Sequence, residues 1–488
     1  MIQRFTLAFF LSSLFFNPVF SQPSTVTVGS TTLDVRVVIE GNNASNGIDI
    51  PWEIQWGPDD YIWMTERYGR VSRLNPETGV RTTILDLTNT VYDNSEAGLL
   101  GMQLHPDFEN TPQVFLAYTY FSGGVKERIV RYNYNSTSGM LENPLTLVEG
   151  INGNTTHIGC RLLILPDNTL LATTGDYQNQ SSPQSESSVS GKILRMNLDG
   201  SIPSDNPFGP SSYLYSIGHR NAQGLVLAPN GIIYSSEHGP QTNDEFNIVE
   251  AGGNYGWPDI EGFCNTSGEM SDCNSMTNYQ DPLAIWYSNS TIAPSDLIWY
   301  DHPAIPEWQG KMLMTVLKAE HLKVIEVNSD GTTVVSEEIL FNNAHANNPS
   351  SSFNQGTFDR LRDICMAPDG RVFLATSGPS WGTSLTWENS IIELRNPAYS
   401  PTGIDESVQT VSTRVYPNPS EGLVQVVFPT ELVGEQFLIT DVLGKIVLSG
   451  RISASHDQLD LSSVAPGLYV LQADNEQFIT NERILISE

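Results

Sequence analysis

The chain is poor in basic residues. Its 488 residues include only 24 Lys and Arg against 55 Asp and Glu, which gives a formal net charge of −31 at pH 7. A charge of this sign repels the phosphate backbone of nucleic acids and anionic lipid surfaces at long range. We therefore expect no nucleic-acid partner. The excess carboxylates suit either a solvated acidic surface or the binding of hard cations such as calcium.

Cysteine is also scarce. The chain has four cysteines, and no pair of them has the CxxC spacing of a zinc site. Cys264 and Cys273 lie close together in a segment rich in Gly, Asn and Ser, so they are plausible disulfide partners in an oxidising compartment. Cys160 and Cys365 each lie in an apolar stretch, where a buried free thiol is the favoured interpretation.

Long apolar runs are missing beyond the N-terminus. No later segment has the roughly 20 apolar residues needed to span a bilayer, so we expect no stable membrane insertion. At the N-terminus, Arg4 precedes a mostly apolar run from Leu7 to Phe16, and Val19-Phe20-Ser21 has the spacing of a signal-peptidase site. This pattern predicts a signal peptide over residues 1–21 and export of the mature protein.

One turn signal recurs along the chain. A Pro-Asp or Pro-Asn turn, or in one case a Gly turn, precedes an alternating apolar run and then a polar cluster. Their spacing is too wide for a continuous hairpin ladder but fits four-stranded blades with variable loops. We therefore predict an all-β fold, a six-bladed β-propeller. The six turns begin at Pro58, Pro106, Pro166, Pro229, Gly310 and Pro368.

Polar side chains are expected to gather at one rim of this propeller. Equivalent strands end at the same rim, around the central channel, where ligands bind. Polar residues at positions that folding requires only to be loops are a functional signal. The residues at these strand ends are Thr65-Glu66-Arg67, Thr174-Gly175-Asp176, Glu237-His238-Gly239, Lys318 and Thr376-Ser377.

The pattern changes near Asn396. We expect a short N-terminal extension over 22–45, the propeller over 46–396, a Pro/Ser/Thr linker over 397–412 and a small C-terminal β-sandwich over 413–488. Three motifs of this last unit are Val415-Tyr416-Pro417-Asn418-Pro419, Asp441-Val442-Leu443-Gly444-Lys445 and Pro466-Gly467-Leu468-Tyr469-Val470. On these motifs the unit resembles the C-terminal sorting domains of the type IX secretion system. The resemblance implies the type IX machinery as a partner, passage through an outer membrane, and a secreted or cell-surface location.

The densest cluster of chemistry-bearing residues spans Ile217 to Pro258. A Gly-Pro step at Gly239-Pro240 interrupts the strand pattern and frees carbonyl oxygens, while Asp244 and Glu245 add carboxylates nearby. Oxygen ligands of this kind suit calcium. A capped turn with a surface acidic pair explains the same pattern.

Four cations fall on rim positions of a chain that has few: Arg220, Lys318, Arg360 and Arg362. Such convergence suggests a polyanionic small ligand, because Arg binds carboxylates through forked hydrogen bonds and Lys as a point charge. The alternative is that Arg360 and Arg362 pair with Asp359 and Asp363.

His157 is the best candidate for a general base. It lies just before the third turn, and an imidazole that titrates near neutrality can accept a proton from a hydroxyl group. A lone His is more often structural.

Many short motifs follow one another in the order found in a known enzyme family. They are Pro51-Trp52-Glu53-Ile54, Thr65-Glu66-Arg67, Gly98-Leu99-Leu100-Gly101, His105-Pro106-Asp107-Phe108, Gly218-His219-Arg220-Asn221, Glu237-His238-Gly239-Pro240, Asp244-Glu245, Gly252-Gly253-Asn254-Tyr255-Gly256-Trp257-Pro258, Leu317-Lys318 and Arg360-Leu361-Arg362-Asp363. Across about residues 46 to 395 the chain thus resembles the soluble PQQ-dependent glucose and aldose sugar dehydrogenases.

This resemblance implies a site and a mechanism. It makes His157 the base that removes a hydroxyl proton from a sugar, while Arg220 stabilises negative charge on the quinone. It implies that Glu96, Arg220, Asn221, His238, Lys318, Arg360 and Arg362 contact pyrroloquinoline quinone (PQQ). It implies further that the carbonyls of Gly239 and Pro240 hold a calcium ion, and that Glu245 and Tyr255 belong to another calcium site. The acceptor of the electrons is not identified.

Three positions depart from the family pattern: Glu96 replaces a Gln, Thr156 an Asp and Asn265 a calcium-binding Asp. Sugar preference and the second calcium therefore stay open. Two other functions remain as alternatives, a non-catalytic propeller that binds carbohydrate or protein, and a calcium-dependent lactonase. The lactonase would need carboxylates in the central channel, for which Glu66, Glu96 and Asp176 are the candidates.

Overall fold

The computed structural model describes residues 24–41, 47–266, 269–286, 290–341, 358, 360–378, 388–400, 409–410, 413–441, 445–474 and 478–487. The predicted signal peptide, residues 1–21, lies outside these ranges. The chain divides after Ala398 into two compact units, each described by itself below.

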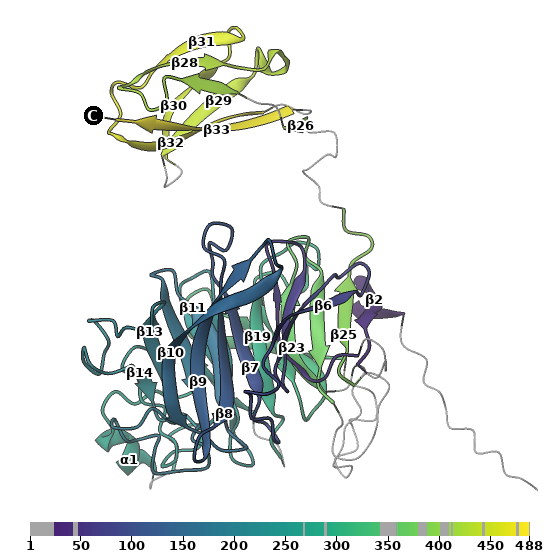
Figure 1. The fold of residues 1–488 in the computed structure, drawn as a ribbon, viewed down its shortest axis with the longest axis vertical. Coiled ribbons are helices and arrows are strands. Elements are labelled where there is room, and N and C mark those ends of the chain that lie inside the picture. The colour runs from purple at the N-terminus through teal and green to yellow at the C-terminus, as the bar shows by residue number, and fades with distance from the viewer. Residues whose placement is uncertain are drawn as a thin grey trace, which may run out of the picture. The chain divides into compact units, whose positions relative to one another are not determined.

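The larger unit is built of antiparallel sheets, so the all-β prediction is confirmed (Figure 1). Each sheet follows the last along the chain. The strands are β3 (Pro51–Trp56), β4 (Ile62–Glu66), β5 (Arg70–Leu74) and β6 (Arg81–Asp86); β7 (Leu99–Leu104), β8 (Gln113–Phe121), β9 (Val125–Asn135) and β10 (Met140–Asn152); β11 (Gly159–Ile164), β12 (Thr169–Thr174), β13 (Lys192–Asn197) and β14 (Leu214–Ile217); β15 (Ala222–Leu227), β16 (Ile233–Glu237), β17 (Asp244–Ile248) and β18 (Ala284–Trp286); β19 (Pro294–Tyr300), β20 (Lys311–Val316), β21 (His321–Val327) and β22 (Val334–Leu340); and β23 (Leu361–Met366), β24 (Val372–Thr376) and β25 (Ile391–Arg395).

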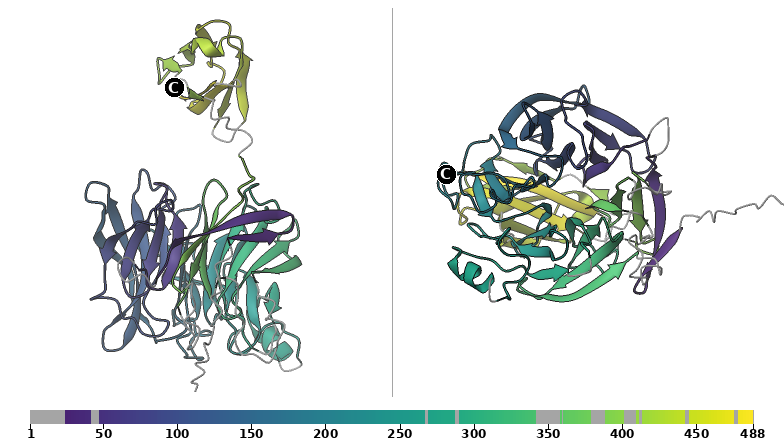
Figure 2. Two further views of the ribbon diagram at one scale, coloured as in Figure 1. Left: turned by 90° about the vertical axis from the view of Figure 1, so that its right-hand side faces the viewer. Right: turned by 90° about the horizontal axis from the view of Figure 1, so that it is seen from below.

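These sheets form a closed ring (Figure 2). The first strand of each sheet packs on that of the next in the order β3, β7, β11, β15, β19, β23 and back to β3. Each of the six predicted turns joins the first and second strands of one sheet. A separate apolar cluster fills the space between each pair of neighbouring sheets. Second strands such as β4, β12 and β16 are therefore buried along their whole length, polar side chains included.

The N-terminal segment differs from the prediction. Residues 22–45 were expected to form an extension ahead of the propeller, but β1 (Thr25–Val28) and β2 (Thr31–Ile39) belong to the last sheet, in the order β1-β2-β25-β24-β23. Val35 pairs with Leu394 and Val37 with Ile392. The chain thus closes its ring by pairing its beginning with a strand from the end of the same unit, which protects the edge of that sheet.

A long connection between β17 and β18 carries α1 (Glu269–Ser275). A disulfide joins Cys264 to Cys273, as predicted, and ties α1 to this connection. Cys160 and Cys365 are free and buried, also as predicted.

The smaller unit contains a five-stranded sheet and a three-stranded sheet. Their strands are β26 (Gln409–Thr410), β33 (Phe478–Ile486), β32 (Gly467–Asp474), β29 (Gln436–Asp441) and β30 (Ile446–Arg451), and β27 (Arg414–Tyr416), β28 (Leu423–Val427) and β31 (His456–Asp460), with a short 3-10 turn at Thr430–Leu432. Side chains from both sheets, such as Val426, Ile439 and Leu471, share one apolar core.

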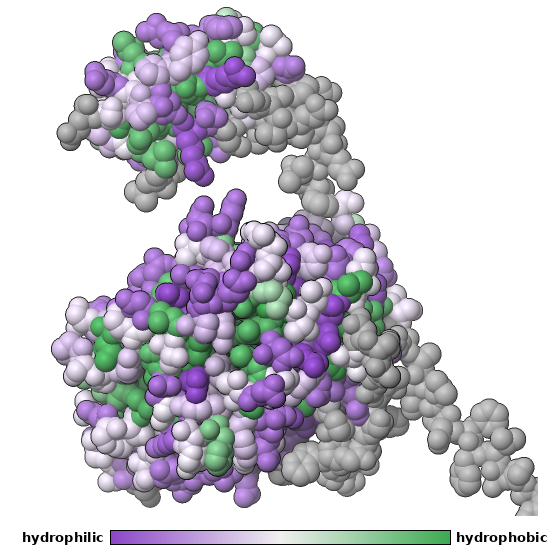
Figure 3. All heavy atoms as spheres, viewed as in Figure 1, coloured by the Kyte–Doolittle hydropathy of each residue, from purple (hydrophilic) through white to green (hydrophobic). Residues whose placement is uncertain are grey.

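Hydrophilic residues cover much of the face seen in Figure 3, as expected for a chain with a net charge of −31. Among the described residues, no helix has the length and apolar character needed to cross a membrane.

Candidate active site

A cavity of about 160 Å³ opens where the second strands end and the first strands begin. Side chains that sequence reasoning assigned to one rim therefore do converge. Six of the seven residues predicted to contact a cofactor line this cavity. The lining residues are Trp52, Glu96, Leu100, Ile158, Gly159, Asn221, Gln223, His238, Ala293, Leu317, Lys318, Arg360 and Arg362. The seventh, Arg220, lies beside it, since its Nη1 donates to the His238 carbonyl at 3.1 Å.

His157 is held between a carboxylate and a guanidinium. Its Nδ1 lies 2.7 Å from Asp176 Oδ1, and its Nε2 lies 3.0 Å from Arg220 Nη2. A guanidinium can only donate, so Nε2 is the accepting nitrogen and Nδ1 carries the proton that is donated to Asp176. The lone pair of Nε2 is engaged by Arg220 in this structure, so to act as a general base Nε2 must exchange this contact for a substrate hydroxyl. The side chain of His157 is 18% exposed, so a substrate can reach it.

Asp176 is fixed as an anion. Burial opposes ionisation, but hydrogen bonds from His157, the Gln178 backbone and Trp257, together with the charge of His157, hold the pKa of Asp176 below its usual value. The indole Nε1 of Trp257 donates to Asp176 Oδ2 at 2.9 Å, and Gln178 N donates to Oδ1 at 2.8 Å. Sequence reasoning placed Asp176 on the rim but gave it no part in the predicted dehydrogenase. The sequence did contain a signal for this role: Asp176 follows the second strand of a sheet, and His157 lies just before the first strand of the same sheet.

Arg220 is mostly buried, and desolvation lowers its pKa against the opposing effect of Asp176, Glu237 and Glu96. Glu237 accepts from the backbone N–H of Arg220 and, at 2.9 Å, from that of Asn221. The Asn221 side chain accepts from Gly159 N at 3.1 Å. A buried carboxylate at the end of β16 thus fixes the start of β15, from which Arg220 and Asn221 reach the cavity.

The cavity wall is cationic. Burial, and then the charge of Arg360, lowers the pKa of Arg362 to about 9. Burial and the charges of Arg220 and Arg362 lower the pKa of His238 to about 3, so its imidazole is neutral. The nitrogens Nε of Arg220, Nε of Arg362 and Nε2 of His238 are buried without a hydrogen-bond partner among the described residues. These are unused donors and acceptors around a cavity.

The alternative that Arg362 serves only to pair with Asp363 finds little support. Asp363 forms its ion pair with Arg161, at 2.9 Å, and Asp359 lies outside the described residues. Glu96 has a distinct place: its Oε2 accepts from His157 N at 2.8 Å, and its charge acts on both Arg220 and Arg362.

The Gly239–Asp244 turn does not use Asp244 as an open carboxylate. Asp244 accepts from Gly239 N at 2.9 Å, Thr291 Oγ1 at 2.7 Å and Ile292 N at 2.6 Å. Its oxygens therefore fasten the turn to Thr291 and Ile292, just ahead of β19, and the role of this segment in calcium binding stays a prediction. A Cβ on Gly239 would lie 2.0 Å from Thr242 O, so the tight turn requires Gly.

Glu245 is half-buried beside another acid, Glu237. Burial, and then the charge of Glu237, raises the pKa of Glu245 to about 8. Glu245 accepts from Asn247 Nδ2 at 3.1 Å, and Asn247 Oδ1 is buried without a hydrogen-bond partner among the described residues. Tyr255 stacks on His219 with ring centroids 4.4 Å apart, and its hydroxyl donates to Ile248 O at 2.6 Å. No group of three or more His, Cys, Asp or Glu suited to a metal occurs in the part of the chain that the structure describes.

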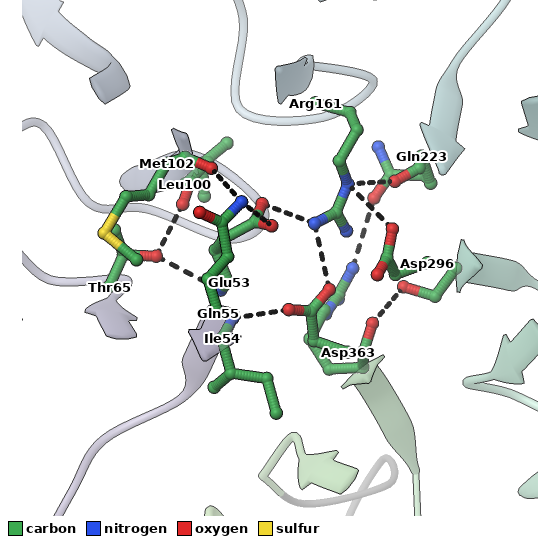
Figure 4. Close-up of polar contacts among 12 residues, drawn as sticks. Glu53, Ile54, Gln55, Thr65, Leu100, Met102, Arg161, Gln223, Asp296 and Asp363 are labelled. Carbon is green, nitrogen blue, oxygen red and sulfur yellow. Dashed lines mark hydrogen bonds and ion pairs between the residues drawn. The ribbon is translucent and has the colours of Figure 1, made fainter. Parts of the chain in front are cut away.

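A buried ion cluster adjoins the cavity at Gln223 (Figure 4). Arg161 of β11 donates to Glu53 of β3, lies 2.9 Å from Asp363 of β23 and 3.3 Å from Asp296 of β19, and donates through Nε to the Gln223 carbonyl of β15 at 2.8 Å. First strands of five sheets thus meet on one guanidinium. Gln223 lines the first cavity, whereas Arg161 lines a second one of about 810 Å³, so the cluster lies between the two.

The carboxylates named for a lactonase are engaged elsewhere. Glu66 accepts from Ser72 Oγ and forms an ion pair of 2.7 Å with Arg81, while Asp176 and Glu96 bind the side chain and backbone of His157. This arrangement supports a base at His157 rather than a carboxylate-bound metal in the channel.

Comparison with known proteins points the same way. A profile of the Glucose / Sorbosone dehydrogenase family matches residues 48–383, and a profile of the Secretion system C-terminal sorting domain matches residues 414–487. The chain is 37% identical over 424 residues to quinoprotein glucose dehydrogenase B of Acinetobacter calcoaceticus, covering 70% of this chain and 85% of that protein. It is 26% identical over 387 residues to aldose sugar dehydrogenase YliI of Escherichia coli strain K12, covering 75% and 96%. The PQQ-bound structure of aldose sugar dehydrogenase from Streptomyces coelicolor is similar with a TM-score of 0.61 and 29% identity, over 74% of this chain and 98% of that one.

Proposed function

The chain belongs to the glucose and sorbosone dehydrogenase family, and on that premise we propose that it oxidises a hydroxyl group of an aldose or related sugar with PQQ and calcium. The observation that carries this proposal is the position of the His157 base beside a cavity walled by cations: His157 does not line the cavity, but its backbone N–H donates to Glu96, which does. The closed ring of sheets supports a six-bladed propeller as its scaffold.

The cavity suits PQQ, a planar quinone that carries three carboxylates. Lys318, Arg360 and Arg362 would hold carboxylates and ring oxygens, together with Asn221 and His238. The unpartnered Nε of Arg362 and Nε2 of His238 are the atoms that such a ligand would satisfy. Trp52 adds an aromatic wall, since the Arg362 guanidinium lies 5.8 Å from its ring centroid. When bound, PQQ supplies a two-electron acceptor for the hydride that leaves the sugar carbon.

We propose two places for calcium. The carbonyls of Gly239 and Pro240, in the tight Gly239–Asp244 turn, would supply hard oxygen ligands at the first. At the second, an ion would compensate the Glu237 and Glu245 pair, with Asn247 Oδ1 and the Tyr255 backbone as further oxygen ligands. A calcium ion bound to the Gly239 turn would act as a Lewis acid.

In the proposed reaction, His157, Arg220 and Glu96 each have a separate role. His157 Nε2 takes the proton of the sugar hydroxyl, and the Nδ1–H bond to Asp176 stabilises the imidazolium that forms. Arg220, whose Nη2 already faces Nε2, places a permanent positive charge where negative charge develops. Glu96 fixes the backbone at His157 and so sets the height of the imidazole over the cavity.

The test is reconstitution of the purified protein with PQQ and calcium, followed by dye reduction with a panel of aldoses. We expect turnover by the wild type and a fall in kcat of at least about 10²-fold in His157→Ala. His105→Ala is the matched control, because His105 lines the opposite cavity and should leave kcat unchanged. Lack of PQQ uptake at micromolar concentration would refute the proposal. Uptake without turnover of any aldose would favour the binding propeller instead.

For cellular location, we propose that residues 1–21 are removed as a signal peptide and that the smaller unit directs type IX export to the cell surface or medium. The profile match to a sorting domain over residues 414–487 supports this route. We propose accordingly that the catalytic domain ends near residue 396, that residues 397–412 link it to the smaller unit, and that the latter is a β-sandwich.

A further inference from the structure

A second cluster of titratable groups lies behind the candidate base and faces away from the cavity. The Glu127 carboxyl, on β9, accepts a hydrogen bond from the Tyr177 hydroxyl, and the Cys160 thiol lies close enough to feel its charge. Glu127 and Cys160 are fully buried, and Tyr177 is 6% exposed. The cluster lies against an apolar core that includes Ala97, Ile129 and Ile158, and burial raises the pKa of Glu127 to about 8. A hydrogen bond is stronger in such apolar surroundings, so a polar group there holds its bonding partner firmly in place.

Tyr177 and Cys160 come from the two loops that carry the base and its carboxylate. Tyr177 directly follows Asp176, and Cys160 lies three residues after His157. One side chain from a neighbouring sheet is therefore hydrogen-bonded to the Asp176 loop and lies beside the His157 loop. The loops also touch each other backbone to backbone: Gly175 N donates to Ile158 O at 3.0 Å, and a Cβ on Gly175 would lie only 1.7 Å from His157 O.

Both loops contain left-handed backbone that side chains rarely adopt. The φ angles are 55° at His157, 72° at Cys160, 51° at Tyr177 and 62° at Gln178. Residues in this region persist only where surrounding contacts determine them, and they gather at functional sites. In the Asp176 loop, the hydrogen bond to Glu127 comes from Tyr177, which has left-handed backbone and precedes a second such residue, Gln178. In the His157 loop, Cys160 has left-handed backbone and lies beside Glu127. Glu127 thus lies where the backbone of both loops most needs support.

We propose that Glu127 is a positioning residue, which holds His157 and Asp176 in register through Cys160 and Tyr177. This inference rests on the proposed function of His157. Glu127 touches neither the cavity nor the His157 side chain, so its effect on turnover must pass through the two loops.

Two variants test the tie in the full chain. Tyr177→Phe removes the hydroxyl and keeps the packed ring, while Glu127→Gln keeps an oxygen that can accept from Tyr177. Tyr132→Phe is the matched control, because Tyr132 is a buried tyrosine on the same strand whose hydroxyl interacts with Tyr118, away from both loops. With PQQ and calcium bound, we expect Tyr177→Phe to lower kcat about tenfold with KM for the sugar changed less than about twofold. Glu127→Gln should stay within about threefold of wild type.

A second readout needs no activity. Hydrogen–deuterium exchange of the protein without added PQQ reports opening of the loops through the amides of His157, Gly175 and Asp176, which are hydrogen-bonded. We expect at least about fivefold faster exchange in peptides covering residues 154–160 and 175–178 of Tyr177→Phe, and unchanged exchange there in Tyr132→Phe. Unchanged exchange and kcat in Tyr177→Phe would overturn the proposal, whatever its melting temperature. Faster exchange in a protein that oxidises no sugar would confirm the tie as a structural feature while refuting the proposed function.

Discussion

Replacement of Asp176 by Asn tests the geometry of the base directly. The carboxylate receives donors on both oxygens: His157 Nδ1 and Gln178 N on Oδ1, and Trp257 Nε1 on Oδ2. An amide has one accepting oxygen and one donating NH2 group, so it cannot satisfy all three donors. Whichever way the Asn turns, one buried contact becomes donor against donor.

Both orientations of the Asn harm the base. If its oxygen faces His157, the NH2 group meets the Trp257 indole and the charge that stabilises the imidazolium is lost. If its NH2 group faces His157, Nδ1 must accept, and the proton moves to Nε2, which can then no longer act as a base. A hydrogen bond to a charged group contributes about 1.5–3 kcal/mol. If this stabilisation is lost only in the transition state, kcat should fall about 10- to 150-fold.

The assay is steady-state dye reduction by Asp176→Asn saturated with PQQ and calcium. PQQ titration separates lost chemistry from lost cofactor, because Asp176 does not line the cavity. Asp205→Asn is a suitable control, since Asp205 is an exposed acid in an ion pair with Arg195. A variant that keeps more than half of the wild-type kcat at full PQQ occupancy would refute the assignment of Asp176 as the orienting partner of His157.

Three further outcomes follow from single contacts. Arg161→Met should destabilise the larger unit by about 3–5 kcal/mol in urea unfolding, because buried carboxylates lose their cation, and adding Asp363→Asn should restore part of the loss. Arg362→Met should weaken PQQ binding about 10- to 150-fold in a Trp-fluorescence titration, with Arg362→Lys less affected. Burial lowers the pKa of His321 to about 4, below the ordinary value of about 6.5, so the neutral imidazole stabilises the fold above pH 6.5 and this contribution is lost as the pH falls toward 4. In urea unfolding, the free energy of unfolding should therefore fall less between pH 7 and pH 5 for His321→Gln than for the wild type.

Local signals in the sequence were sufficient to find the sheets. Turns such as those at Pro166 and Pro368 reverse the chain whatever surrounds them, so they mark the step from first to second strand in each sheet. Closure of the ring had no such signal. Strand β2 pairs with β25, more than 350 positions away along the chain, and only the three-dimensional ring brings them together. The segment was therefore taken for an extension.

The site was predicted unevenly for a similar reason. Rim positions could be read from strand ends, and Lys318 and His238 do meet there. The partners of His157 could not be predicted from strand ends. Its two ring nitrogens reach Asp176 and Arg220 only because the backbone at His157 itself is left-handed. Asp244 shows another limit: an acidic residue beside a Gly-Pro step looks like a metal ligand in sequence, whereas in the structure its oxygens accept from Gly239 N of the same turn and from Ile292 N ahead of β19.

The two cavities of the channel show why charge, rather than size, identifies the site. The larger one, of about 810 Å³, is lined by Glu53, Asp60, Asp107, Glu109 and Asp296 against the single guanidinium of Arg161. The smaller one, of about 160 Å³, is lined by Lys318, Arg360 and Arg362 against Glu96. Since Coulomb interactions strengthen where water is excluded, a tricarboxylate is attracted to the second and repelled by the first. Arg161 lies in the ion cluster between the two cavities. It neutralises the carboxylates of Glu53, Asp296 and Asp363, so their negative charge does not weaken the attraction of the smaller cavity for a carboxylate ligand.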